Sequence, residues 1–196
     1  MTQKNTHTKT PKLRLPEFID EWEIEQFKNL TKINQGLQIP ISERYLEKVD
    51  NSHFYITNEF LKKGSEKKYF IKNPPESVLC EENDILMTRT GNTGMVVTNV
   101  SGAFHNNFFK ISYPEEIDKS FLYYFLNLTS TQKTIMRLAG TSTIPDLNHS
   151  DFYRIHFIFP LLNEQQKIAS FLSAVDKKLN LLQQKKALLE GYKKGV

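Results

Sequence analysis

The chain changes character at residues 158–169, which read IFPLLNEQQKIA. Pro160 cannot belong to a helix interior, and residues 163–166 (NEQQ) have the form of a capping box that starts a helix. From there to about Lys194 the sequence contains no proline, and Gly191 is the only glycine. The sequence therefore predicts one long helix at the C-terminal end of the chain.

Apolar side chains recur along this helix with the spacing of a coiled coil. Six positions form the stripe, at intervals of seven residues with an intermediate position: Ile168, Leu172, Val175, Leu179, Leu182 and Leu189. About 30 helical residues extend on the order of 45 Å, too far to be buried entirely on a small domain. We therefore expect these six residues to form a dimerisation seam. The alternative is a helix that packs on its own domain.

The residues before this helix, 11–160, predict a globular part of mixed structure. Four runs have strand composition and are bounded by turn residues: 85–88, 95–98, 108–111 and 155–159. Ser120 is a candidate N-cap for a helix over 121–128, and a second helix over 130–139 stops at Gly140. The expected fold class is α+β: a globular domain with a small curved β-sheet and a few helices, followed by a long helix that forms a coiled coil.

The composition excludes several classes of protein. With 39% hydrophobic and 24% charged residues, the chain has the composition of a soluble globular protein, and no apolar run approaches the ~18 residues that span a bilayer. Residues 1–10 are polar and are predicted to be a disordered leader, not a secretory signal. We expect a cytoplasmic protein with no membrane partner. Cys80 is the single cysteine and the five histidines lack metal-ligand spacing, so neither a disulfide nor a metal site is expected.

The net charge of +4 and the pI near 9.0 invite a nucleic-acid function, but the charge is unevenly distributed. Residues 11–160 hold 17 Lys and Arg against 19 Asp and Glu, a net charge of −2, whereas residues 161–196 hold 7 against 3, a net charge of +4. The excess lies in the C-terminal segment and the leader. Charge alone therefore does not establish DNA binding.

Motifs for catalysis are weak. Residues 73–75 (NPP) are similar to the start of the catalytic loop of amino-methyltransferases, but no glycine-rich loop follows a strand to hold a methyl donor. Nuclease chemistry requires clustered carboxylates around a metal, and Asp84 and Asp146 qualify only by residue type. Nothing resembles a serine or cysteine nucleophile elbow. The chain is expected not to be an enzyme.

The residues left for function are those of recognition. The loop at 88–94 (TRTGNTG) joins two strands and offers hydroxyl, amide and guanidinium groups with two glycines that allow close backbone approach. Such a loop can contact phosphates and place an arginine on a guanine edge. The candidate DNA-binding residues in it are Thr88, Arg89, Thr90, Asn92 and Thr93. The alternative is an ordinary hairpin turn with Arg89 paired to a surface acid.

Three further groups complete the candidate DNA-binding set. The hydroxyl run Thr141-Ser142-Thr143 follows a predicted helix, with a polar cap as its alternative reading. The lysine cluster Lys62, Lys63, Lys67 and Lys68 lies among aromatic residues, with a solvated surface as its alternative. The amides that can read base edges are Gln35, Gln38 and Asn106.

These motifs, in order, resemble one repeat unit of a type I restriction-modification specificity subunit, which is a target recognition domain followed by a spacer helix. The match starts at residues 13–18 (LRLPEF) and at Glu21-Trp22, and continues at 83–91 (NDILMTRTG). Its most specific part is GTSTIPDL at 140–147, followed by the sequence at 158–169. The resemblance covers nearly all of the chain from residue 11 onward.

Two positions depart from the family pattern. Asn83 stands where the family usually has glycine, and Leu161 where it usually has a second proline after Pro160. Neither departure removes the match.

The resemblance implies a non-catalytic chain in which residues 11–160 are the target recognition domain and residues 161–196 the spacer and dimerisation helix. Full-length members carry two of each, with the helices paired antiparallel. A half-length form is therefore expected to bind double-stranded DNA as an antiparallel homodimer on a bipartite, palindromic site.

The resemblance also implies partners: a type I methyltransferase subunit that carries S-adenosylmethionine, and a restriction/translocase subunit. This chain itself is expected to hold no cofactor. The alternative from another class is a protein-interaction or regulatory module that acts through its helix and never contacts DNA. Basic side chains converging on one concave face would discriminate in favour of DNA.

Overall fold

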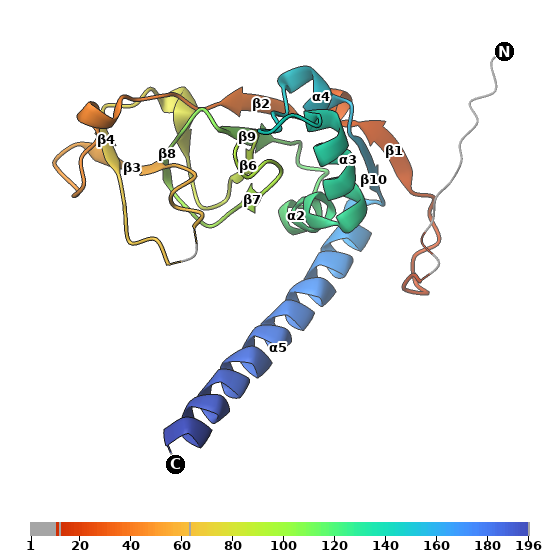
Figure 1. Ribbon diagram of the computed structural model, residues 1–196. Helices are drawn as coiled ribbons and strands as arrows, with labels where there is room; N and C mark the ends of the chain where they lie inside the picture. The colour runs from red at the N-terminus through yellow and green to blue at the C-terminus, as the bar shows by residue number, and fades with distance from the viewer. Residues whose placement is uncertain (1–10, 12, 63, 196) are drawn as a thin grey trace.

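The computed structural model describes residues 11, 13–62 and 64–195. The expected leader at 1–10 and Lys63 lie outside this range. Figure 1 shows a globular part built from short strands and helices, from which one long helix, α5 (Leu162–Gly195), projects. The expected α+β class is confirmed, although the strands form three small sheets instead of one.

A two-stranded sheet closes the globular part next to α5. β1 (Glu23–Gln26) pairs antiparallel with β10 (His156–Phe159), with Glu23 opposite Phe159 and Gln26 opposite His156. The two ends of the globular part are therefore held side by side at the start of the long helix.

The other two sheets each have four strands. The first is antiparallel and has the order β2 (Lys32–Gln35), β9 (Phe108–Ser112), β6 (Ile85–Thr88), β7 (Val96–Val97). The second has the order β4 (Phe70–Lys72), β3 (Ser52–Ile56), β8 (Gly102–Phe104), β5 (Leu79–Cys80), in which β3 and β8 run parallel. The strands predicted at 85–88, 108–111 and 155–159 are present, and the one predicted at 95–98 is shorter.

Short helices join the strands. They are α1 (Phe27–Leu30), α2 (Lys119–Asn127), α3 (Thr129–Ala139), α4 (His149–Tyr153) and the 3-10 helices η1 (Ile41–Glu43) and η2 (Glu76–Val78). Gly140 ends α3 with a φ of 88° and a ψ of 174°, a positive-φ conformation that glycine adopts without strain.

The predicted N-cap of α2 is wrong by two residues. Asp118, not Ser120, caps this helix, because the Asp118 carboxylate accepts the backbone N–H of Phe121 at 2.8 Å.

The central strand β6 separates two apolar cores. Ile85 and Met87 point to one side, where they join an aromatic cluster that includes Phe27, Phe152 and Phe157. Leu86 points to the other side, into a core shared with the β3/β8 sheet. All four residues of β6 are fully buried, as expected for alternating side chains of a strand covered on both faces.

The base of α5 is fixed to the globular part by buried polar groups. The carboxylate of Glu164 accepts two hydrogen bonds from the Arg14 guanidinium, at 2.7 and 2.6 Å, and a third from the indole N–H of Trp22 at 3.3 Å. The amide of Gln165 donates to the backbone oxygens of Glu116 and Pro160 and accepts the N–H of Asp118. Since Glu164 and Gln165 are only 2% and 1% exposed, these partners satisfy groups that burial would otherwise penalise.

The predicted capping box is therefore not formed. A box capped by Asn163 would make Glu164 the first helical residue and Gln166 the residue that closes the box, but the helix begins two residues earlier, at Leu162, so Asn163 lies inside its first turn. Asn163 accepts only the N–H of its neighbour Glu164.

Beyond its base, α5 leaves the globular part. Ala169 is buried, whereas Val175, Leu179, Leu182 and Leu189 of the predicted seam are 39%, 50%, 53% and 58% exposed. Ile168, the first residue of the predicted seam, packs against the globular core instead. A helix packed along its own domain would also bury the rest of the stripe, so that alternative is wrong for Val175 to Leu189. None of the helices in the described part of the chain has both the length and the apolar character needed to cross a bilayer.

Candidate nucleic-acid interface

The buried side chain of Thr88 holds the loop between β6 and β7 in its conformation. This side chain is fully buried; its hydroxyl bonds the backbone oxygen of Asn92 and accepts the N–H of Met95 at 2.9 Å. Gly91 and Gly94 adopt positive φ angles of 87° and 88°, which lets the loop turn tightly. Thr88 was expected to contact DNA; in the structure it is a positioning residue instead, and Asn92 is exposed at the tip.

Arg89 is held by an acid from a distant part of the chain. Its Nε and Nη2 donate to the two oxygens of Asp146 at 3.0 and 2.6 Å, and its guanidinium lies 5.7 Å from the centre of the Phe109 ring. The Arg89 side chain is 18% exposed and that of Asp146 47%. The paired arrangement, which the sequence left open, is the one present in the protein without DNA.

Backbone contacts join the loop at 88–94 to the loop that follows α3. Thr90 forms a bridge with Asp146, the N–H of Leu147 donates to the oxygen of Arg89 at 2.9 Å, and the Thr93 hydroxyl donates to the oxygen of Pro145 at 2.7 Å. Two motifs that the sequence offered separately thus form one surface.

The predicted hydroxyl run lies at the outer end of this surface. Thr141, Ser142 and Thr143 are all exposed, and the Ser142 hydroxyl donates to the backbone oxygen of Ile144 at 2.8 Å. The side chain of Ile144 is itself 65% exposed. The hydroxyl groups of Thr141 and Thr143, which bond no described residue, and the apolar side chain of Ile144 are thus open to solvent.

The three predicted amides also come together. The Gln35 amide donates to the backbone oxygen of Asn106 at 3.1 Å, and the Asn106 amide donates to the Gln38 side-chain oxygen at 3.1 Å. The next residue, Asn107, accepts the backbone N–H of Arg89 at 2.7 Å. This hydrogen bond connects the amide cluster to the loops around Arg89.

The lysine cluster is divided. Lys62 is paired with Glu59 at 2.6 Å, while Lys67 and Lys68 are exposed; Lys63 lies outside the described residues. The turn that carries Lys62 is tied to the Arg89 loop, because the Asn58 amide donates to the oxygen of Thr90 at 3.1 Å.

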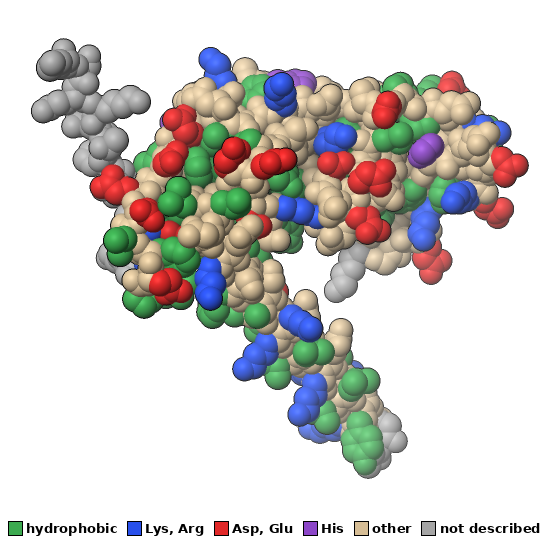
Figure 2. Space-filling view, turned by 180° about the vertical axis from the view of Figure 1, so that it is seen from behind, with side chains coloured by type: hydrophobic (Ala, Val, Ile, Leu, Met, Phe, Trp, Pro, Cys, Tyr) green, Lys and Arg blue, Asp and Glu red, His purple; other side chains and the backbone are tan. Residues whose placement is uncertain are grey.

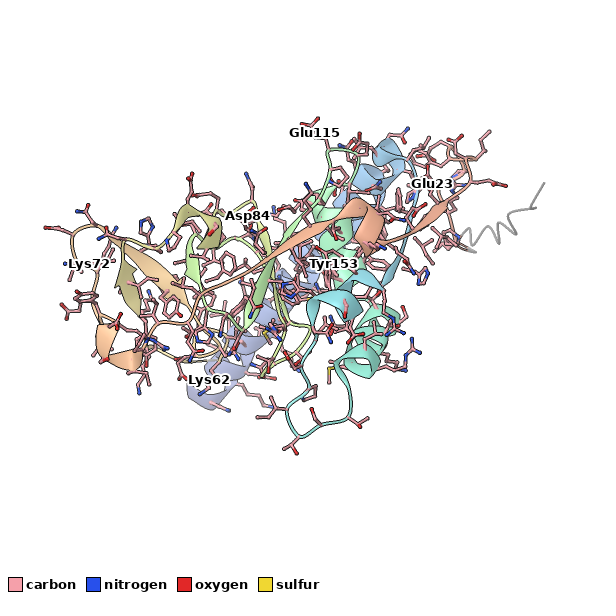
Figure 3. All side chains as sticks on the ribbon, turned by 90° about the horizontal axis from the view of Figure 1, so that it is seen from above. Glu23, Lys62, Lys72, Asp84, Glu115 and Tyr153 are labelled. Atoms are coloured by element: carbon pink, nitrogen blue, oxygen red, sulfur yellow. The ribbon has the colours of Figure 1, made fainter. Side chains whose placement is uncertain are left out.

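We call this assembly the loop surface: residues 58–62, 89–93, 105–107 and 141–147, with Gln35 and Gln38 beside it. Figure 3 shows Lys62 at the same edge of the globular part as the loop that follows α3, with Glu115 at the opposite edge and Asp84 towards the Glu115 side. Figure 2 shows Asp and Glu side chains spread over the face of the globular part turned away from the view of Figure 1. The acidic face and the loop surface are therefore on different sides.

His105 lies in the turn that carries Asn106 and Asn107. Burial lowers the pKa of its imidazole, and the charge of Arg44 lowers it further. The neutral ring accepts the N–H of Asn107 on Nδ1 at 3.1 Å. This part of the loop surface thus depends on an uncharged histidine.

The described residues form neither a metal site nor a reactive cysteine. No group of three or more His, Cys, Asp and Glu side chains there is arranged to hold a metal ion. Burial, followed by the charge of Asp84, raises the pKa of the Cys80 thiol to about 12, which keeps it protonated and poorly nucleophilic.

Sequence reasoning missed Asn58, Asn107 and Phe109, which support the Arg89 loop. Asn58 contacts Thr90, and Asn107 and Phe109 contact Arg89. These contacts join residues far apart in the sequence, so residue type alone could not predict them.

Comparison with known proteins gives consistent results. The family described as the Type I restriction modification DNA specificity domain matches residues 19–191. The Type I restriction enzyme MjaVIII specificity subunit of Methanocaldococcus jannaschii is 27% identical over 187 residues, which cover 94% of this chain and 42% of that protein. The chain thus spans less than half the length of this curated relative.

Solved structures share the fold. A chain from a structural study of complex assembly and conformational transition of the type I R-M system has a TM-score of 0.69 at 18% identity, covering 92% of this chain and 44% of that one. The HsdS subunit from Thermoanaerobacter tengcongensis has 0.64 at 16%, covering 90% and 42%. The Type-I restriction-modification system S subunit from M. genitalium has 0.63 at 24%, covering 89% and 44%.

Proposed function

Because this chain belongs to the type I restriction-modification DNA specificity family, whose role is recognition and not catalysis, we propose that it reads a DNA sequence for partner enzyme subunits. The observation that carries the proposal is the loop surface. There, hydroxyl, amide and guanidinium groups from segments far apart in the sequence converge away from the acidic face. These are the side chains that hydrogen-bond phosphates and base edges.

DNA binding requires Arg89 to exchange partners. In the free protein the Nε and Nη2 atoms of Arg89 both donate to the carboxylate of Asp146. A phosphate or a guanine edge offers the same fork of acceptors, so the guanidinium can replace one bidentate contact with another. Asn92 and the hydroxyls of Thr141 and Thr143 are already exposed and require no such exchange.

The protein acts as an antiparallel homodimer through α5. Support comes from the apolar stripe, in which Val175, Leu179, Leu182 and Leu189 are each at least 39% exposed on a helix of 34 residues. Phe171, Leu181 and Leu188 widen this face, which suits an antiparallel pair better than a narrow zipper. The dimer holds two copies of the loop surface apart, so that its site is bipartite and palindromic.

The partners are a type I methyltransferase subunit, which carries S-adenosylmethionine, and a restriction/translocase subunit. The cell compartment is the cytoplasm, as expected for a protein of this DNA specificity family. Residues 11–160 serve as the target recognition domain and residues 161–196 as the spacer.

A gel-shift titration at low salt tests the proposal, with the purified chain alone and with its methyltransferase subunit. Methylome sequencing of a host that carries the protein should reveal a bipartite methylated motif. No DNA binding with the methyltransferase present, together with an unchanged methylome, would support the alternative of a module that acts only through protein contacts.

A further inference from the structure

A cavity of about 750 Å³ lies between α1 and α4, outside the loop surface, and we call it the α1–α4 groove. Figure 1 shows α4 and β2 on the side of the globular part away from α5, and Figure 3 labels Tyr153 on the face seen from that side. The groove is lined by Gln26, Lys28, Asn29, Leu30, Thr31, Lys32, Ser150, Tyr153 and Arg154. A partner helix on α5 would leave it open.

The walls of the groove are held in place by contacts of their own. The Tyr153 hydroxyl accepts the N–H of Ile33 at 3.2 Å, which joins α4 to β2. Beneath it, the rings of Phe27 and Phe152 stack with centres 5.0 Å apart. The groove is therefore formed before any ligand arrives, so little ordering is needed on binding.

The lining is cationic. Lys28 and Lys32 are exposed and form no ion pair with any described residue, and Arg154 uses one guanidinium nitrogen on Asp151 at 3.0 Å. No Asp or Glu lines the groove. This is notable in a globular part whose net charge is −2. Unpaired lysines beside amide and hydroxyl donors form a surface suited to phosphate oxygens.

The groove adjoins the loop surface through Phe109. The ring of His149, at the start of α4, lies 4.9 Å from the Phe109 ring, and the Arg89 guanidinium lies 5.7 Å from the centre of the same ring. A ligand that contacts Arg89 therefore has only the first turn of α4 between it and the groove.

We propose that the α1–α4 groove binds the phosphodiester backbone of the DNA whose bases the loop surface reads. Lys28, Lys32 and Arg154 contact the phosphates next to the recognised half-site and contribute affinity without sequence preference. The inference rests on the proposed function, because it assumes that the loop surface engages DNA. It assigns the groove to DNA and not to an acidic segment of a partner protein.

The test compares Lys28→Ala/Lys32→Ala with the wild type. A matched control, Lys133→Ala/Lys177→Ala, removes two exposed lysines elsewhere, one on α3 and one on α5. The 196-residue chain is titrated with a random-sequence DNA duplex at several salt concentrations by fluorescence anisotropy. Circular dichroism checks that each variant is folded.

The groove variant should bind about tenfold more weakly at low salt, and its plot of log affinity against log salt should be shallower by about 2. The control should match the wild type. Equal losses in both variants would overturn the inference, because they would indicate a general effect of net charge. Unchanged DNA binding with impaired assembly with the methyltransferase subunit would also overturn it and assign the groove to a protein partner.

The outcome also separates this inference from the proposed function. Suppose that the wild type binds DNA, that Arg89→Ala weakens this binding, and that the groove variant binds as tightly as the wild type. In that case only the assignment of the groove fails. If the wild type binds no DNA even with its methyltransferase subunit, the proposed function fails and the groove assignment with it.

Discussion

Arg89 and Asp146 form a bidentate ion pair across the junction of two loops that lie 57 residues apart in the sequence, with N–O distances of 3.0 and 2.6 Å. The backbone of each loop is fixed independently of this pair, because Leu147 donates its N–H to the oxygen of Arg89 and Asn107 accepts the Arg89 N–H. The charged groups can therefore separate while the loops stay in position. This makes both residues suitable for substitution.

Arg89→Ala should weaken binding to the specific site by about 1–3 kcal/mol, as expected for the loss of a bidentate contact to a base or phosphate. The fold should survive because the backbone hydrogen bonds of Arg89 to Asn107 and Leu147, which hold the loop, do not depend on the side chain. A salt-controlled titration measures the effect, with Arg137→Ala on α3 as the matched control. Unchanged DNA binding would show that Arg89 does not contact the DNA.

Asp146→Asn should have the opposite effect on random-sequence DNA. The substitution weakens the hold on Arg89 and removes one negative charge from the loop surface, so binding should tighten about threefold to tenfold at low salt. Anisotropy titrations measure this, with Asp84→Asn on the other side of the globular part as the control. Weaker binding would indicate that Asp146 itself holds the DNA-bound conformation.

Val175→Glu combined with Leu182→Glu should convert a dimer to a monomer in analytical ultracentrifugation. The two side chains are 39% and 53% exposed, so burying charge at the seam opposes association without disturbing the globular core. Lys177→Glu, on the same helix outside the seam, should remain dimeric. A double variant that still dimerises would contradict the assignment of the seam.

Glu164→Ala should lower the free energy of unfolding by on the order of 3 kcal/mol, because it leaves the mostly buried Arg14 guanidinium without its carboxylate. Gln166→Ala, two residues along and exposed, should change it by less than about 0.5 kcal/mol. Chemical denaturation measures both. Equal effects would show that the Arg14–Glu164 pair does not stabilise the base of α5.

His105 should make the protein less stable in mild acid. Its pKa is lower in the folded than in the unfolded protein, so its contribution is complete above the unfolded value of 6.5 and is lost as the pH falls below that value. His105→Gln should reduce the difference in free energy of unfolding between pH 7.5 and pH 5.5. His53→Gln, on an exposed position of β3, should leave that difference unchanged.

Two local features, the long C-terminal helix and the end of α3, were predicted correctly from the sequence, whereas the caps of α2 and α5 were not. The helical run of α5 and the end of α3 at Gly140 both depend on residues within one or two turns of each other. β1 and β2 were missed because their sequences, EIEQ and KINQ, are mostly polar and are stabilised by strands more than 70 residues away.

The residues of the candidate site could be predicted from the sequence, but the contacts between them could not. Arg89 and the hydroxyl run were recognised by residue type, but the contact between Arg89 and Asp146 depends on chain topology. The same is true of the α1–α4 groove, where Lys32 and Arg154 come from opposite ends of the globular part. Glu164 was recognised as part of a motif, but its partner Arg14 lies 150 residues earlier.

The pairing of β1 with β10 has an evolutionary consequence. Gln26 and His156 are opposite each other, so the segment between them begins and ends at the same place in the fold. One such segment can be exchanged for another by recombination at its two neighbouring ends, and α5 keeps its length. The sequence of the globular part can thus change without a change in α5.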